Sequence, residues 1–371
     1  RLCYGLTEVV IPNGVTTIGR GAFYDCSYLT SITIPSTVTE VKRGGFASCN
    51  RLTDIYISDI AAWMNIKFDP MDEYHIMDQS NSSKTLYLNN KAVTALVIPN
   101  GILEIAPSAF CGCNFTSVSL PDSLTKIGSS AFANCRSLTS VVIPNQVTHI
   151  EPSAFASCIN LTNIVIPNRV THIGSSAFAN CQNLSGVIIG NQVRSIGDAA
   201  FSECKKLQQI TIPDNVAYVG KAAFSGCSNL AKVTIGAQVT GISDRMFYQC
   251  DKLSTVVIPD NVLTIGESAF EECGELTKVT MGNGITTIGN SAFNHCSKLN
   301  QVSFSDSTTT IGKNAFAGCS ALTDVVFGKK LEVIGQKAFE RCTNLTNVTF
   351  SDSLTTIGNL AFDWCPNFQM I

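Results

Sequence analysis

The chain has 371 residues, of which 45% are hydrophobic and 14% are charged, and its formal net charge at pH 7 is −3. The low charge and the lack of a basic run argue against a nucleic-acid partner, which requires a basic patch or stripe. Apolar runs reach about six residues, far short of the ~20 that a membrane-spanning helix requires, so we expect no membrane span.

A Phe-x-x-Cys pattern returns every 23 residues along almost the whole chain. A fixed period of this size is typical of stacked supersecondary units, each of which buries its apolar side chains against its neighbours. Both ends of the chain cut a unit, so we expect the parent protein to continue beyond them. One complete unit, LTSVVIPNQVTHIEPSAFASCIN, runs from Leu138 to Asn160. The phenylalanines of the pattern are Phe23, Phe46, Phe110, Phe132, Phe155, Phe178, Phe201, Phe224, Phe247, Phe270, Phe293, Phe316, Phe339 and Phe362.

Each unit is predicted to form three segments in chain order. The segment L-T-x-V-x-I alternates side chains as a strand does, and the Pro that often follows ends the strand because Pro cannot donate to a sheet. The segment V-T-x-I is β-branched and alternating, which predicts a second short strand. The segment S-S-A-F-x-x-C predicts one helical turn, with Phe filling the space between the strands and the helical side.

Stacking of these units predicts an α/β repeat solenoid, a right-handed arc of about fifteen units with a period of 23 residues. Parallel strands ~4.8 Å apart would line the inner face, and the short second strand and the helical turn would lie on the outer side. We predict that residues 1–371 form a single solenoid, interrupted by an insertion at about 58–92.

The insertion is predicted to contain a short helix and a hairpin. Asp59 is placed to cap a helix that continues through Trp63. A polar turn at 89–91 lies between two apolar segments, which predicts a hairpin with strands at 86–88 and 93–98.

Two interpretations of the insertion stay open. Its Trp63 and the methionines at 64, 71 and 77 could contact a ligand, because insertions in repeat proteins lie on one face and often bind. The same side chains could instead form a small core against the side of the solenoid, since Trp and Met pack well in cores. The insertion also contains a cluster of mainly acidic residues: Asp69, Asp72, Glu73, His75 and Asp78. Their spacing lacks the Asp-x-Asp-x-Asp-Gly form of a calcium loop, so we predict a solvated acidic loop.

The cysteines recur at one position of the repeat, except for Cys111. In a ladder of parallel strands, neighbouring Cβ atoms would lie farther apart than the ~3.8 Å mean of a disulfide. We therefore expect buried free thiols, which behave as small hydrophobic side chains. A zinc site would need clustered pairs such as C-x-x-C, and Cys111-Gly112-Cys113 is not one.

The repeated run I-P-x-x-V-T-x-I-G-x-x-A-F-x-x-C closely resembles the BspA-like leucine-rich repeats of bacterial surface and secreted proteins. The resemblance covers nearly all of residues 1–371, and L-T-x-V-x-I has the L-x-x-L-x-L form of a leucine-rich repeat strand. It implies a curved leucine-rich repeat fold, display at the cell surface or outside the cell, and an adhesin-like, protein-binding role. It implies no particular ligand.

The outward position of the first strand carries no charged residue in any unit. Val142, Val165 and Ile188 would stack there as one apolar strip on the inner face, and such strips mark protein contacts. This uncharged ladder is therefore the candidate partner-binding surface, although β-branched residues also suit a plain sheet surface. The candidate residues are Val142, Val165, Ile188, Thr211 and Thr234, with Tyr56 and Trp63 from the insertion and its flank.

The sequence shows no catalytic constellation. It contains no G-x-S-x-G, H-E-x-x-H or P-loop motif. His149 and His172 occupy the same position of adjacent units and would be neighbours, but no third ligand repeats beside them. An exposed, variable ladder is the better interpretation of these histidines. We expect no catalytic residue, no cofactor and no metal.

We therefore expect a non-catalytic, extracellular protein-binding or adhesion module of a bacterial surface or secreted protein. Its partner would be a protein or glycan, with host extracellular matrix and cell-surface components as candidates. Three alternatives stay open: a structural spacer that displays another domain, an enzyme with its site in the insertion, and a self-assembling matrix protein.

Overall fold

The structure is a computed structural model that describes residues 5–68, 76–77 and 83–368. The chain divides into two compact units, Arg1–Pro167 and Asn168–Ile371, and each is described by itself. The single solenoid over residues 1–371 stays a prediction. The acidic cluster of the insertion and Met71 lie outside the described residues.

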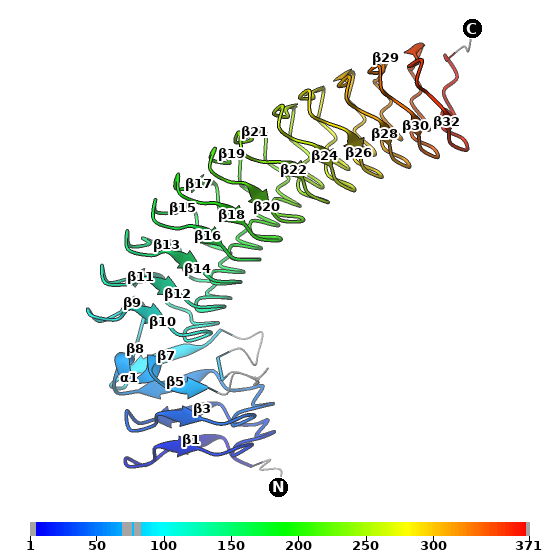
Figure 1. The fold of residues 1–371 in the computed structure, drawn as a ribbon. Helices are drawn as coiled ribbons and strands as arrows, with labels where there is room; N and C mark the ends of the chain where they lie inside the picture. The colour runs from blue at the N-terminus through cyan, green and yellow to red at the C-terminus, as the bar shows by residue number, and fades with distance from the viewer. Residues whose placement is uncertain (1–4, 69–75, 78–82, 369–371) are drawn as a thin grey trace. The chain divides into compact units, whose positions relative to one another are not determined.

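Within each unit, parallel strands stack as successive turns of a solenoid (Figure 1). Regular turns pair positions that lie 23 residues apart, such as Gln209 with Lys232. Each turn of the repeat contributes a first strand and a second strand, and the connections between parallel strands of one sheet are right-handed as a rule. The predicted solenoid fold is confirmed in both units, which together contain about fifteen turns.

In the first unit, two separate rows of strands run along the stack. The first strands are β1 (Glu8–Val10), β3 (Ser31–Ile34), β5 (Asp54–Ile57), β7 (Thr85–Leu88), β9 (Ala95–Val97), β11 (Ser117–Ser119), β13 (Ser140–Val141) and β15 (Asn163–Val165). The second strands are β2 (Thr17–Ile18), β4 (Glu40–Val41), β6 (Lys67–Phe68), β10 (Glu104–Ile105), β12 (Lys126–Ile127) and β14 (His149–Ile150).

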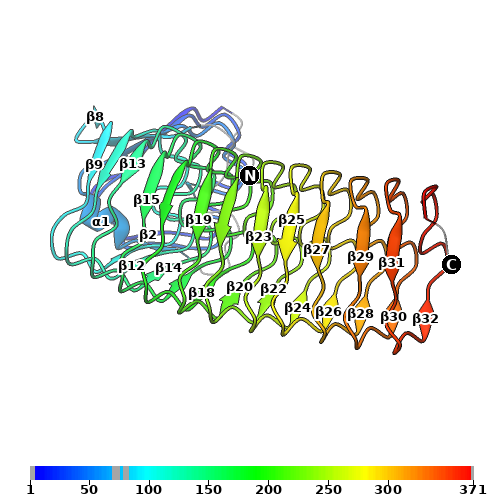
Figure 2. The same cartoon turned by 90° about the horizontal axis from the view of Figure 1, so that it is seen from above.

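The second unit has the same two rows, which lie along opposite edges of the stack in Figure 2. Its first strands are β17 (Gly186–Ile188), β19 (Gln209–Thr211), β21 (Lys232–Thr234), β23 (Thr255–Val257), β25 (Lys278–Thr280), β27 (Gln301–Ser303), β29 (Asp324–Val326) and β31 (Asn347–Thr349). Its second strands are β16 (His172–Ile173), β18 (Ser195–Ile196), β20 (Tyr218–Val219), β22 (Gly241–Ile242), β24 (Thr264–Ile265), β26 (Thr287–Ile288), β28 (Thr310–Ile311), β30 (Val333–Ile334) and β32 (Thr356–Ile357).

In the second unit, the phenylalanines of the repeat form one continuous stack that runs from turn to turn. From Phe178 to Phe362, successive ring centroids lie 5.1–5.7 Å apart and the ring planes are within 16° of parallel. Phe155, Phe178 and Phe201 are fully buried, as the register of the repeat predicts. Rings at this spacing pack in the offset arrangement that aromatic pairs favour, so each turn buries the aromatic side chain of the next.

Substitution of Phe201 by Ala should lower the free energy of unfolding by ~3–5 kcal/mol, the usual cost of deleting a buried Phe. Phe201 is fully buried between Phe178 and Phe224. The same change at Phe362, which is half-buried near the end of the stack, should cost clearly less. Chemical denaturation of both variants measures the difference, and equal losses would contradict stabilisation by neighbouring turns.

The predicted helical turn around each Phe is wrong. In the unit around Phe155, Ser153 and Ser157 have φ of 57° and 59°, in the left-handed region. A left-handed residue cannot continue a right-handed helix, so the segment forms consecutive tight turns. The backbone then alternates its partners: Ala154 N donates to Glu151 O within the turn, and Ala154 O accepts from Phe132 N of the preceding turn. This side of the solenoid is thus a third hydrogen-bonded ladder.

The insertion begins with the predicted short helix. It is α1 (Ile60–Met64), and the Asp59 carboxylate accepts a hydrogen bond of 2.7 Å from Ala62 N at its N-terminus. The sheets continue through the inserted segment, because β6 pairs in parallel with β4 and β7 pairs in parallel with β5. The inserted residues therefore add to the stack while they depart from the repeat sequence.

The predicted hairpin exists, but its second strand starts earlier than expected. β7 pairs with β8 (Lys91–Ala92) in antiparallel register across Asn89 and Asn90, whose φ values are 50° and 64°. Positive φ at both positions is the geometry of a type I′ turn, which closes a hairpin with two loop residues. The residues expected in the second strand instead form β9, which pairs in parallel with β11.

The cysteines of the repeat are free thiols under the aromatic stack, as predicted for those that the structure describes. In a typical turn, the Cys Sγ donates a hydrogen bond to the carbonyl oxygen of a Phe in the preceding turn. Cys158 donates to Phe132 at 3.1 Å, and Cys204 donates to Phe178 at 3.3 Å. The thiol fills a small buried space and also caps a backbone acceptor, which accounts for Cys at this position. Burial raises the pKa of Cys227 to about 12, since it penalises the thiolate.

A thiol count on the unfolded protein, purified without reductant, should approach sixteen, the number of cysteines in the chain. The basis is that the described cysteines form no disulfide and that all of them except Cys365 are buried. A count near zero after denaturation would show that the ladder oxidises to disulfides.

Stability should fall as the pH rises above about 9. Buried thiols such as Cys204 and Cys227 keep their proton in the folded state, while unfolded thiols ionise near their ordinary pKa. The unfolded state then binds fewer protons than the native state, so the free energy of unfolding decreases by up to about 1.4 kcal/mol per pH unit for each such thiol.

Chemical denaturation between pH 8 and pH 11 measures this slope. A variant with Cys204, Cys227 and Cys250 changed to Ala is the matched control. It should be less stable at neutral pH but should lose stability less steeply above pH 9, and an unchanged slope would assign the alkaline lability to other groups.

Candidate binding surfaces

The ladder face is the row of outward side chains on the first strands. In the first unit it consists of Val10, Thr33, Tyr56, Tyr87, Val97, Ser119, Val142 and Val165. In the second unit it consists of Ile188, Thr211, Thr234, Val257, Thr280, Ser303, Val326 and Thr349.

Most of the predicted partner-binding residues lie exposed on this face. Val142 is 80% exposed, Val165 is 55% exposed and Ile188 is 63% exposed. Thr211 and Thr234 are also exposed. These side chains are held on hydrogen-bonded strands, so they offer apolar surface that is already ordered before any partner binds.

Trp63 is a correction to the predicted set. It is only 3% exposed, and its indole Nε1 donates to Ala109 O at 2.9 Å. Phe68 packs edge-on against the indole at 6.3 Å, and Met64 and Met77 are buried as well. Trp63 therefore belongs to a small core in the insertion and offers no surface to a partner.

A second row of side chains on the same face carries charge. It lies two residues earlier in each first strand and so points the same way. In the second unit, Lys278 and Asp324 of this row line a groove of about 720 Å³ together with Thr280 and Val326 of the ladder face. Lys278 and Asp324 were not among the predicted site residues, because the prediction concerned the uncharged row alone.

The tyrosine groove, in the first unit, is an open hollow of about 330 Å³ over β1, β3 and β5. Its lining contains no charged residue: Val10, Ile11, Pro12, Asn13, Thr33, Ile34, Pro35, Tyr56, Ile57, Ser58, Asn89 and Asn90. Tyr56 forms one wall and stacks on Tyr87, with ring centroids 4.3 Å apart and planes 11° from parallel. The predicted site residue Tyr56 is half-buried because of this contact.

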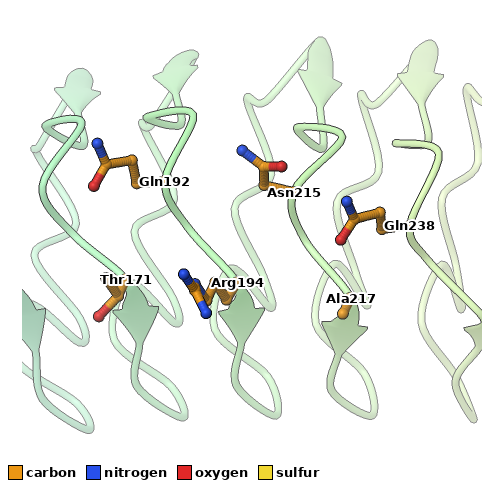
Figure 3. Close-up of a pocket in the computed structure, with 6 residues that line it drawn as sticks. All are labelled: Thr171, Gln192, Arg194, Asn215, Ala217 and Gln238. Atoms are coloured by element: carbon orange, nitrogen blue, oxygen red, sulfur yellow. The ribbon is translucent and has the colours of Figure 1, made fainter.

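A third hollow lies between the two rows of strands in the second unit (Figure 3). It measures about 450 Å³, and most of the side chains that line it carry a polar group. Gln192, Asn215 and Gln238 reach it from loops that follow the first strands, while Arg194 and Ala217 reach it from just before β18 and β20. Ala217 is smaller than the side chains at the same position of its neighbours, which opens the space beside Arg194. In the sequence, this hollow is indicated by the side-chain amides that recur every 23 residues at Gln192, Asn215 and Gln238. These residues were not among the predicted site residues.

The two predicted histidines lie on the surface. His149 and His172 are both exposed. The hydroxyl of the preceding Thr lies 2.9 Å from Nδ1 of His149 and 2.8 Å from Nδ1 of His172. Within the described ranges, no group of three or more His, Cys, Asp or Glu side chains is placed to hold a metal ion. No helix of residues 5–68, 76–77 or 83–368 has the length and apolar character needed to cross a bilayer.

The stacked parallel strands and the L-T-x-V-x-I strand motif place the protein in the class of leucine-rich repeat solenoids. The chain belongs to the BspA-type leucine-rich repeat family, because the family model described as "BspA type Leucine rich repeat region (6 copies)" matches residues 1–71, 80–208, 171–300 and 240–369. No curated protein matches the sequence.

Solved structures of bacterial leucine-rich repeat proteins are similar to this chain. One from Bacteroides ovatus is 26% identical with a TM-score of 0.64 over 99% of this chain and 86% of the other. A leucine-rich cell surface protein from Faecalibacterium prausnitzii is 26% identical with a TM-score of 0.50 over 98% of this chain and 86% of the other. One from Eubacterium ventriosum is 24% identical with a TM-score of 0.60 over 84% and 82%, which shows the shared fold alone.

Proposed function

We propose that this chain is a non-catalytic binding module of a bacterial surface or secreted protein, and that its ladder face binds a protein or glycan of the extracellular matrix or of another cell surface. One observation carries the proposal. The ladder face presents uncharged, mostly β-branched side chains on consecutive turns, and several are more than half exposed, such as Val142 and Val257.

Burial of these side chains would favour association. Each fully buried Val or Ile contributes about 1.5–3 kcal/mol relative to exposure. The strands are already fixed by parallel pairing, so binding requires little ordering of the surface. The adjacent row with Lys278 and Asp324 supplies charges that can select one partner and one register.

A surface location agrees with the family and with the cell surface protein of Faecalibacterium prausnitzii to which the chain is similar. The grooves over the first strands favour binding over a role as a plain spacer, since a spacer needs no concave site. Buried thiols whose pKa is raised, such as that of Cys204, are poor nucleophiles, which argues against thiol catalysis.

The test changes Val142 and Val165 to Lys together, both in the first unit. The added charges would have to be buried in a central contact, which costs on the order of several kcal/mol. We expect binding to immobilised fibronectin, fibrinogen or mucin, measured by surface plasmon resonance, to weaken at least about tenfold. Both side chains are exposed, so the variant should fold normally.

The matched control changes Leu103 and Tyr24 to Lys. These residues are 61% and 56% exposed and lie outside the first strands, so the control adds the same charge elsewhere on the same unit. It should bind as the unaltered protein does. Undiminished binding by the folded Val142 and Val165 variant would remove the ladder face of this unit from the proposal.

A further inference from the structure

The tyrosine groove departs from the repeat at its aromatic wall. Parallel pairing aligns Thr33, Tyr56 and Tyr87 on β3, β5 and β7. One ring face of Tyr56 is covered by Tyr87 at 4.3 Å, so its other face is directed toward the space above Thr33. Thr33 is too small to fill that space, which is the reason that the groove opens there.

The position of the Tyr56 ring is fixed by its surroundings. Burial raises the pKa of Tyr87, and the nearby Asp54 carboxylate and Tyr56 hydroxyl raise it further. The hairpin turn behind the pair is held by its type I′ geometry and by a hydrogen bond from Asn89 N to Ile57 O of 3.0 Å. The aromatic wall is therefore built before a ligand arrives, which reduces the ordering cost of binding.

Neutral polar groups surround the aromatic wall. The amides of Asn13, Asn89 and Asn90 lie exposed in the lining, and each amide offers both donors and an acceptor. The lining has no charged residue, and the nearest row on the same face carries the carboxylates of Glu8 and Asp54. This arrangement disfavours an anionic ligand and suits one that has hydroxyl groups and no charge.

We propose that the tyrosine groove binds a neutral oligosaccharide, with one pyranose ring against the open face of Tyr56 and its hydroxyl groups on the asparagine amides. The electron-rich ring face attracts the C–H groups that line one side of a sugar ring. A peptide strand would gain its main-chain hydrogen bonds at a sheet edge, and this groove lies on the face of the sheet. The inference rests on the proposed binding function and specifies a ligand class for one part of the ladder face.

The experiment measures binding of maltohexaose, cellohexaose, laminarihexaose and mannohexaose by isothermal titration calorimetry, with oligogalacturonate as the anionic probe. At least one neutral oligosaccharide should bind, and oligogalacturonate should bind more weakly. Tyr56→Ala should weaken the binding at least about tenfold, because it removes the aromatic wall. Tyr56→Phe keeps the ring and should retain affinity within about threefold.

Two further variants distinguish loss of the groove from loss of the folded structure. Thr33→Phe fills the space beside Tyr56 without removing a buried group, and it should also abolish binding. Tyr24→Ala removes an exposed tyrosine from the tight-turn side of the same unit and should change nothing. Circular dichroism and thermal unfolding confirm that each variant is folded.

The inference is overturned if no neutral oligosaccharide binds, if binding survives both Tyr56→Ala and Thr33→Phe, or if oligogalacturonate binds best. Loss of fibronectin binding by Tyr56→Ala without any sugar binding would likewise overturn it and assign the groove to a protein. Val142 and Val165 lie outside the sheet that forms the groove, so their Lys variant tests the proposed function separately.

Discussion

Hydrogen bonding between neighbouring turns is the constraint on which the rest of the structure depends. Within each unit, a turn pairs its backbone with the next at the first strand, at the second strand and along the tight-turn segment. Residues at the same position of consecutive repeats therefore lie about one strand spacing apart, near 4.8 Å. The Phe stack, the row of Cys thiols beneath Phe carbonyls and the ladder face are three results of that one alignment.

The alignment also determines where recognition can arise. Core positions repeat because each must fit a copy of itself in the next turn, and a change at one core position would disturb two neighbours. Outward positions are free to vary, so local chemistry appears where a side chain departs from its row. The Tyr56–Tyr87 pair and the hollow beside Arg194 and Ala217 are such departures.

The sequence was sufficient to predict the solenoid, the buried Phe register, the free thiols and the capped helix, because these depend on spacing and local chemistry alone. It was not sufficient for the tight-turn segment, since left-handed positions are occupied by residues such as Glu203 and Lys337 that have no preference for that conformation. It also could not place Trp63, because a helix of five residues is too short to show which of its faces is apolar.

The glycine after the second strand is another case in which the sequence indicated a residue but not its reason. The repeated run places Gly after V-T-x-I, and in the structure the requirement is close approach between turns. A Cβ on Gly128 would lie 2.5 Å from the carbonyl oxygen of Ile105 in the preceding turn. Hydrogen bonding from Gly128 N to the same oxygen explains why the two backbones come so near.

The left-handed turn residues have an energetic consequence for the array. A residue other than Gly in this conformation costs roughly 1–2 kcal/mol, and the hydrogen bonds along the tight-turn side hold it in place. Several such residues are exposed, among them Arg341, Leu360 and Trp364. This edge of the solenoid is therefore held under local conformational tension along its length. Glycine at these sites would remove this conformational cost one turn at a time, without any change to the core or to the ladder face.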